Sequence, residues 1–236
     1  MVMFVVPSIA CAREPKRDAT LALPDARSAY ASTTAKLEAK RRTLASRYVA
    51  AKHMSERHDL QQEAREAVLT AITTKYFSAW SGTPWDFNGT SQVPGQGSIA
   101  CGYFVTTLVS HAGFRIARAH LAQQVSELIV KTLAPSSSTW RFRKGDPNVV
   151  IRKVKDEGEG LYVVGLDNHV GFLWNDAGLV KFCHASYVGT KVAGCERADT
   201  SAAFASNYHV VGRLLTPKMM SAWLTGSQMT HELDAD

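Results

Sequence analysis

The stretch between Pro24 and Gly82 contains neither glycine nor proline, and this absence constrains the fold more than any other feature. Those two residue types are the ones that most disfavour a helix interior. The stretch is rich in Ala, Leu, Lys, Arg, Glu and Gln, so it predicts one long helix or two. Its middle part, residues 50–66, is polar all round. We therefore expect a partly exposed helical arm that docks on the main domain at its C-terminal end.

Downstream of the arm the pattern changes from helical to β. Residues 81–98 are rich in Gly, Pro, Ser, Thr and Asn, which predicts a loop. Apolar faces predict helices over residues 100–118 and 121–133. Short runs of β-favouring residues, separated by Gly, Asn and Asp, predict strands over residues 149–154, 161–166, 169–174, 179–184 and 209–215. Helices followed by an antiparallel meander are typical of an α+β domain.

The first twelve residues, MVMFVVPSIACA, are apolar and uncharged. They resemble the end of a secretory signal, so we expect a bacterial protein that is exported, either periplasmic, membrane-anchored or secreted. The motif SIAC at residues 8–11 resembles a lipoprotein cleavage site, which makes Cys11 a candidate lipid anchor. A buried N-terminal strand is the structural alternative. No run of about 18 apolar residues occurs in the sequence, so no transmembrane helix is predicted.

These patterns divide the chain into four segments. The segments are an export remnant (1–12), a linker with the helical arm (13–64), the main domain (65–220) and a C-terminal tail (221–236). The arm is a candidate surface for partner contact, although a solvated helical spacer explains its polarity equally well. His53 and His58 lie five residues apart on this arm and do not share one helix face, so we expect solvated side chains rather than metal ligands.

The chain carries 27 Lys and Arg against 21 Asp and Glu, a net charge of +6. A basic surface favours polyanionic surroundings such as a cell wall, an anionic membrane face or nucleic acid. The basic residues do not gather into a stripe interleaved with aromatic residues, which argues against a nucleic-acid partner.

Four cysteines are present, and one of them is a candidate nucleophile. Cys183 and Cys195 are close in sequence, and we hypothesise that they pair, which leaves Cys101 as a free thiol. Cys101 also stands where the loop becomes a helix. The amides and dipole of a helix N-terminus favour the thiolate and can stabilise an oxyanion. A small buried hydrophobic residue is the structural alternative.

A thiol nucleophile needs a base, and two histidines stand on neighbouring predicted strands. His169 begins one strand and His184 ends the next. If the connecting turn lies at residues 175–178, the two imidazoles face each other directly across the hairpin. One ring can then act as the base while the other orients it by a hydrogen bond.

Four short motifs follow one another along the chain: GTPWDFNG at residues 82–89, ACGYFV at 100–105, HVGF at 169–172 and HAS at 184–186. They resemble, in order and spacing, the motifs of the NlpC/P60 family of cell-wall cysteine peptidases, over about residues 65–215. The resemblance implies a papain-like α+β core, in which the Cys-bearing helix packs on an antiparallel sheet.

The resemblance also implies roles for five residues. Cys101 becomes the nucleophile, His169 the base and His184 the orienting third member. Trp85 takes the place of the family's loop tyrosine, and Trp85 and Phe87 are expected to contact substrate. Family members hydrolyse amide bonds in peptidoglycan stem peptides through an acyl-enzyme, without a metal or cofactor.

Two departures from the family pattern motivate alternative functions. Ala100 stands where the family has Asp, and Gly102 where it has Ser. A binding or interaction protein that keeps the fold but has lost the chemistry is one alternative. A CHAP-type amidase is another, although its third member is usually acidic or Asn, so His184 favours the NlpC/P60-type site.

Overall fold

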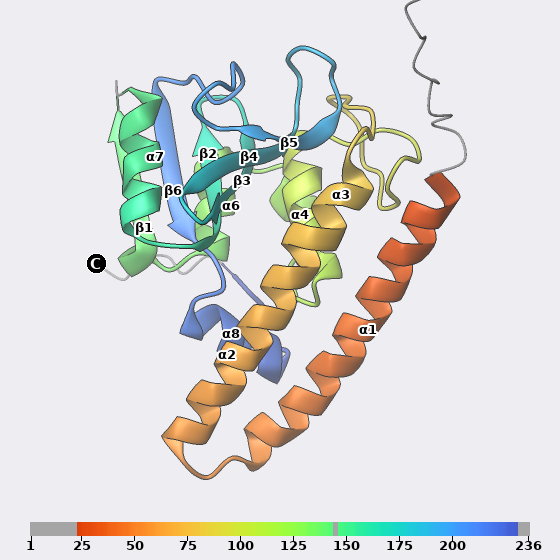
Figure 1. Ribbon diagram of the computed structural model, residues 1–236, viewed down its shortest axis with the longest axis vertical. Helices are drawn as coiled ribbons and strands as arrows, with labels where there is room; N and C mark the ends of the chain where they lie inside the picture. The colour runs from red at the N-terminus through yellow and green to blue at the C-terminus, as the bar shows by residue number, and fades with distance from the viewer. Residues whose placement is uncertain (1–22, 144–145, 231–236) are drawn as a thin grey trace, which may run out of the picture.

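The computed structural model describes residues 23–143 and 146–230, with side chains from residue 26 onward. The expected export segment, the candidate lipid anchor Cys11 and most of the linker lie outside the described residues. The described chain has an α+β fold, as the sequence predicts. It consists of a six-stranded antiparallel sheet flanked by helices, with a long helical hairpin that projects from it (Figure 1).

The sheet has the strand order β1-β6-β2-β3-β4-β5, and every neighbouring pair is antiparallel. The strands are β1 (Thr139–Arg143), β2 (Gly160–Leu166), β3 (Val170–Asp176), β4 (Leu179–Ala185), β5 (Ala193–Arg197) and β6 (Tyr208–Arg213). The consecutive strands β2, β3 and β4 form the predicted meander. The sequence did not predict β1 and β5, which lie at the two edges.

The helices before the sheet are α1 (Leu23–Ala50), α2 (Met54–Thr70), a π-helical turn (Ala71–Tyr76), α3 (Phe77–Trp80), α4 (Cys101–His111), α5 (Arg118–Ala122) and α6 (Ser126–Leu133). Those among and after the strands are a short 3-10 turn (Ser136–Ser138), α7 (Pro147–Asp156) and α8 (Pro217–Thr225). The Gly- and Pro-free stretch therefore forms two long helices joined by a short turn. None of the described helices is both long and apolar enough to cross a membrane.

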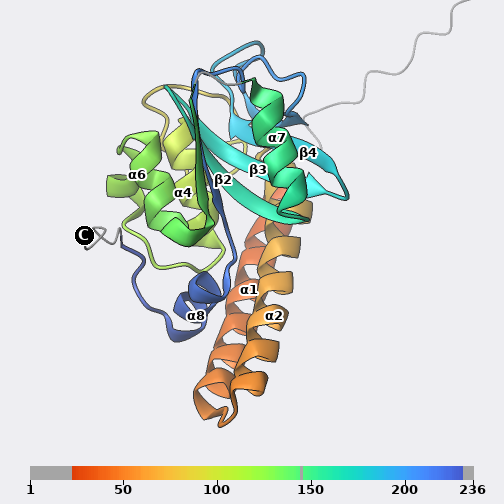
Figure 2. The ribbon, with the colours of Figure 1, turned by 90° about the vertical axis from the view of Figure 1, so that its left-hand side faces the viewer.

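Side chains on the two faces of the sheet enter two separate cores. On β2, Leu161 and Val163 join the core that contains α4 and α6, whereas Tyr162 and Val164 pack with α7. Figure 2 shows α7 on one side of the sheet and α4 and α6 on the other. This alternation follows from the two-residue repeat of a strand that is buried on both faces.

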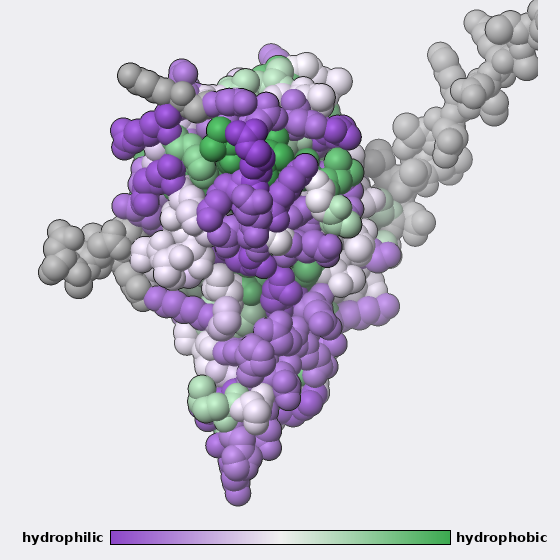
Figure 3. Space-filling view, turned by 60° about the vertical axis from the view of Figure 1, so that its left-hand side comes forward, coloured by the Kyte–Doolittle hydropathy of each residue, from purple (hydrophilic) through white to green (hydrophobic). Residues whose placement is uncertain are grey.

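The helical arm docks along most of its length, not only at its C-terminal end. On α1, Tyr30, Leu37 and Leu44 are buried, and α1 and α2 both pack against α8. The hairpin end, by contrast, exposes mainly polar side chains, including His53 and His58 as expected (Figure 3). The arm is thus part of the main core near the sheet and solvated at its far end.

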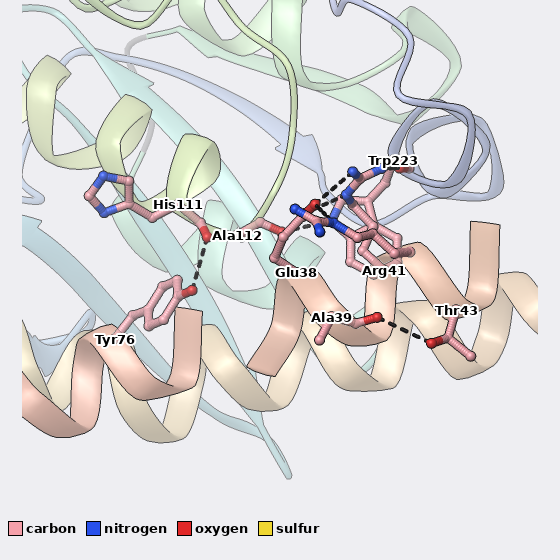
Figure 4. A network of polar contacts seen from close by, with 9 residues as sticks. Glu38, Ala39, Arg41, Thr43, Tyr76, His111, Ala112 and Trp223 are labelled. Atoms are coloured by element: carbon pink, nitrogen blue, oxygen red, sulfur yellow. Dashed lines mark hydrogen bonds and ion pairs between the residues drawn. The ribbon is translucent and has the colours of Figure 1, made fainter. Parts of the chain in front are cut away.

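The π-helical turn after α2 and helix α8 hold the C-terminal end of α4 (Figure 4). The Tyr76 hydroxyl donates to the His111 carbonyl at 3.0 Å, and the Trp223 indole N–H donates to the Ala112 carbonyl at 2.7 Å. Arg41 donates in turn to the Trp223 carbonyl at 3.4 Å. Carbonyls at a helix end have no partner within the helix, so these donors satisfy them. They fix the helix that carries Cys101 at its opposite end.

The predicted strand over residues 149–154 is wrong, because this segment is part of α7. The Asp146 side chain accepts from the Asn148 N–H at 2.9 Å, and Pro147 occupies the first turn. A capping carboxylate followed by proline favours a helix start. Val150, Ile151 and Val154 then share one buried face. The cap and this face outweigh the β preference of the valines and isoleucine.

Three further boundaries differ from the predicted ones. The helix over residues 100–118 ends at His111, because Gly113 adopts a φ of +96° and the Phe114 N–H donates back to the Val109 carbonyl. The predicted helix over residues 121–133 is divided into α5 and α6. The expected tail from residue 221 begins inside α8, whose Trp223 is buried in the core.

Candidate active site

Cys101 is the first residue of α4, directly after the extended residue Ala100. Backbone N–H groups of Val170, Gly102 and Cys101 itself lie within hydrogen-bonding reach of the sulfur and lower the pKa of the thiol. Burial raises that pKa by more, so its net direction is upward from the ordinary value. The expectation of a lowered thiol pKa at this helix start is therefore wrong in direction, because desolvation of the thiolate outweighs the amides.

A disulfide joins Cys183 on β4 to Cys195 on β5, as hypothesised from the sequence. The two residues are direct partners in the register of these strands. Cys101 is consequently the free cysteine of the described chain.

The two predicted histidines are in contact and buried. His169 Nε2 and His184 Nδ1 are 2.8 Å apart, and the side chains are 3% and 2% exposed. Their register differs from the prediction, because Ala177 and Gly178 form a two-residue turn with positive φ and Asp176 pairs with Leu179. His184 therefore comes opposite residue 171 instead of residue 169. A shift of two residues keeps both rings on the same face, as diagonal neighbours.

Gly171 makes room for this arrangement. A Cβ atom at Gly171 would lie 2.6 Å from Cε2 of Phe182 and 2.9 Å from Cβ of His184. The Phe182 ring stacks on the His184 imidazole, with centroids 4.1 Å apart and an angle of 14° between the planes. A side chain at position 171 would displace this stack. The glycine in the HVGF motif is thus a steric requirement of the paired imidazoles.

A carboxylate that the sequence interpretation missed completes the line of polar groups. Glu196 on β5 places Oε1 3.1 Å from His184 Nε2. The Ser201 hydroxyl donates to the same oxygen at 2.5 Å. Only the hypothesised pairing of Cys183 with Cys195 could have indicated this contact, since in an antiparallel pair it makes residue 196 a diagonal neighbour of residue 184.

This carboxylate determines where the imidazole protons lie. An ionised Glu196 only accepts hydrogen bonds, so Nε2 of His184 carries the proton and its Nδ1 is an acceptor. His169 must then donate from Nε2, which leaves its Nδ1 as an unprotonated base. Burial, with a smaller contribution from neighbouring His184, lowers the pKa of His169 to about 3. Burial also lowers the pKa of His184, against the opposing effect of Glu196. Both rings are neutral at neutral pH.

Nδ1 of His169 is buried and has no hydrogen-bond partner among the described residues. The Cys101 sulfur lies beside the backbone N–H of Val170, the residue that follows His169. No hydrogen bond joins the Cys101 thiol to the His169 imidazole. The predicted nucleophile therefore lies next to the backbone that follows the predicted base, but the two side chains are not hydrogen-bonded. Such contacts are often longer in a free enzyme than with substrate bound.

A cleft of about 720 Å³ opens at Cys101. Its aromatic walls are Trp85, Phe87, Tyr103 and Tyr187. Trp85 and Phe87 therefore lie at the same cleft as Cys101, and the sequence interpretation missed Tyr103 and Tyr187. The Tyr187 ring contacts both the His169 ring at 5.1 Å and the Trp85 ring at 6.1 Å between centroids. Tyr187 thus separates the buried imidazole from the loop that carries Trp85.

Acid is expected to destabilise the fold through His169. The unfolded chain binds a proton at this residue near pH 6.5, but the folded chain does so only near pH 3. The unfolded state therefore holds more protons between these values, so the free energy of unfolding decreases as the pH falls through this window. At about 1.4 kcal/mol per pKa unit, the loss reaches several kcal/mol. Urea unfolding from pH 7 to pH 4 measures it.

A matched pair of variants isolates this effect. His169→Gln should reduce the dependence of unfolding free energy on pH, although burial also lowers the pKa values of His111, His184 and His209. His58→Gln, at an exposed site on the arm, should leave the dependence unchanged. An equal slope in the wild type and in His169→Gln would show that the acid sensitivity arises elsewhere.

The raised pKa of the Cys101 thiol predicts slow alkylation at neutral pH. The thiolate is the reactive form, so the rate constant for iodoacetamide should still be rising at pH 9, the ordinary pKa of a cysteine. Mass spectrometry after limiting labelling locates the modified residue. A rate that is already constant between pH 7 and pH 8 would instead indicate a stabilised thiolate.

Within residues 23–143 and 146–230, no group of three or more His, Cys, Asp or Glu side chains is placed to bind a metal ion.

Comparison of the chain with protein-family models, with curated proteins and with solved structures finds no match.

Proposed function

We propose that this chain is an exported cysteine hydrolase that cleaves amide bonds through an acyl-enzyme, with peptidoglycan stem peptides as its substrates. In this proposal the core is papain-like and of the NlpC/P60 type. The observation that carries it is the chain of hydrogen bonds from Glu196 through His184 to His169. This chain leaves Nδ1 of His169 unprotonated and without a partner, close to the free thiol of Cys101 at the start of α4. A nucleophile, a base and an orienting group are the three parts that covalent hydrolysis requires.

The roles follow from the tautomers. Nδ1 of His169 accepts the proton of the Cys101 thiol as the sulfur attacks the substrate carbonyl carbon. The backbone N–H of Cys101 at the start of α4 stabilises the negative charge on the carbonyl oxygen. His169 then donates its proton to the leaving amine, and a thioester remains on Cys101. Water, deprotonated by His169, hydrolyses the thioester and restores the thiol.

The Cys101 thiol and the His169 imidazole are both neutral before substrate binds, and this determines when the proton moves. The thiol has a raised pKa and the imidazole a lowered one, so a resting thiolate–imidazolium pair is disfavoured. Proton transfer then accompanies attack on the carbonyl, as in general-base catalysis. The imidazolium that forms is stabilised by His184 and, behind it, by Glu196.

Three features support export to the cell wall. The apolar segment 1–12 has the composition of an export signal, with Cys11 as a candidate lipid anchor. The Cys183–Cys195 disulfide fits an oxidising compartment. The net charge of +6 favours an anionic polymer as surroundings.

The direct test is digestion of purified peptidoglycan and of soluble muropeptides by the wild type and by Cys101→Ala. Liquid chromatography with mass spectrometry should reveal a new amine and a new carboxyl group only with the wild type. Acid quenching during turnover should trap a thioester on Cys101. Equal product with both proteins, or none with either from pH 5 to pH 9, would overturn the proposal.

A second candidate is a binding protein in which the chemistry is lost. The observation that favours it is the missing hydrogen bond between Cys101 and His169, together with pKa shifts that disfavour the charged form of each group. It predicts that wild type and Cys101→Ala bind the same muropeptides with equal affinity and that neither cleaves them. A CHAP-type amidase is less well supported, because a histidine and not a carboxylate contacts His169.

A further inference from the structure

The cleft at Cys101 is unusual in the charge of its walls. Of the described residues that line it, none carries an ionisable acidic or basic side chain apart from the thiol and the tyrosine phenols. The whole chain has 48 Asp, Glu, Lys and Arg residues and a net charge of +6, so this neutrality is local. A substrate with free carboxylates would find no opposite charge inside the cleft.

Two charged groups that contact neighbours of the cleft are already engaged in hydrogen bonds. The Arg118 guanidinium donates to Thr107 Oγ1 at 2.8 Å and to the carbonyls of Thr90 and Ser91, and it stacks on the Tyr103 ring. The Glu196 carboxylate accepts from His184 and from Ser201. Neither group is available to a charged ligand without losing these bonds.

Four amide side chains line the cleft, and two of them, Gln123 and Gln124, each use one donor inside the protein and keep an unused acceptor. Gln123 donates through Nε2 to the Tyr103 hydroxyl at 2.9 Å, and Gln124 donates through Nε2 to the His120 carbonyl at 3.0 Å. Their Oε1 atoms have no partner among the described residues. These oxygens attract N–H donors such as peptide and carboxamide groups, whereas a carboxylate only accepts and is repelled.

From these observations we infer that the cleft takes an uncharged segment: the groups that flank the scissile amide carry N–H donors and apolar or planar surface, and no free carboxylate or ammonium. Burying an unpaired ion costs far more than burying a hydrogen-bonded amide, and four aromatic rings offer flat apolar surface instead. This inference rests on the proposed function for the cleavage itself. For a stem peptide it means that the two residues at the scissile bond are neutral, with any carboxyl side group amidated.

The experiment uses thiol labelling, which needs the cleft but not turnover. Methanethiosulfonates that carry neutral hydroxyethyl, anionic sulfonatoethyl or cationic trimethylammonioethyl groups transfer the corresponding alkylthio group to the Cys101 thiolate. The new S–S bond forms a mixed disulfide, the reagent's S–S bond breaks, and methanesulfinate leaves. Each rate constant is divided by that of the same reagent with 2-mercaptoethanol at the same pH. The neutral reagent should then be faster than both charged ones by about tenfold, which corresponds to about 1.4 kcal/mol. A benzyl reagent should be faster still.

A variant with an added charge tests whether the rate differences arise from the charge of the cleft. Gln123→Lys adds a cation at the cleft and should accelerate the anionic reagent, whereas Ser55→Lys adds the same charge on the exposed end of the arm and should not. Equal normalised rates for the three reagents, or a preference for the anion in the wild type, would overturn the inference. Either result leaves the proposed hydrolysis to be judged by muropeptide digestion. Charge selectivity without any digestion would instead retain the cleft as a binding site for uncharged ligands.

Discussion

Gly171→Ala is expected to lower kcat/KM for the amide substrate by about 100-fold, the loss typical of a misplacement near 1 Å in a catalytic group. The new Cβ would lie 2.6 Å from Phe182 Cε2, 2.9 Å from His184 Cβ and 3.0 Å from the Cys183 carbonyl oxygen. The last two are backbone-linked atoms, so a side-chain rotation cannot relieve the clash. The His184 ring must move, and its hydrogen bond to His169 Nε2 lengthens or breaks. Muropeptide turnover measures the effect.

The matched control lies on the next strand. Gly194 pairs with His184 from β5, but a Cβ atom there would meet only Ser81 Oγ, at 3.9 Å. Gly194→Ala should therefore retain wild-type turnover. Urea unfolding shows whether Gly171→Ala is still folded, because overpacking of this kind costs about 1–3 kcal/mol. A folded Gly171→Ala variant with full activity would contradict the role assigned to the paired imidazoles.

Glu196→Ala is expected to lower kcat by about 10- to 100-fold with little change in KM, less than the roughly 10⁴-fold loss that a wrong histidine tautomer causes in a serine protease. Without the carboxylate, His184 is free to carry its proton on Nδ1. His169 must then accept at Nε2 and hold its own proton on Nδ1, which removes the base. The Glu196 side chain is 47% exposed, so water replaces it in part and limits the loss.

A conservative variant separates this positioning role from a loss of folding. The Oε1 atom of Glu196→Gln still accepts from His184, so this variant should recover most of the kcat that Glu196→Ala loses. Asp199→Asn removes a carboxylate from the same edge of the sheet, where Asp199 pairs with Arg197, and should leave kcat unchanged. Equal losses in the alanine and glutamine variants would show that the tautomer is not what Glu196 controls.

Local sequence patterns were sufficient for much of the architecture. The absence of Gly and Pro between residues 24 and 82 predicted the helices, because helix propensity is a property of short segments. Turn residues between apolar runs likewise predicted the β2-β3-β4 meander. The same local reasoning proposed Cys101, His169 and His184, and the resemblance to the NlpC/P60 motifs added Trp85 and Phe87. Their catalytic and binding roles remain predictions.

Other features depended on turn conformation, capping and tertiary packing, which the apolar patterns alone do not specify. The register of β3 and β4 followed from the conformation of Ala177 and Gly178, which moved the pairing by two residues. Residues 149–154 formed a helix because a cap and a core face outweighed β propensity. Edge strand β5, which no pattern indicated, brought Glu196 to His184.

The sequence by itself determined which residue types were available for chemistry and where α4 and the meander strands lie. Only the tertiary structure decided the protonation of the site. A helix start lowers the pKa of a thiol, and a neighbouring carboxylate raises that of an imidazole, yet both effects are smaller here than desolvation. Burial depends on all the elements that pack around a group. A pattern along the chain can therefore identify Cys101, His169 and His184, but not the direction in which their pKa values move.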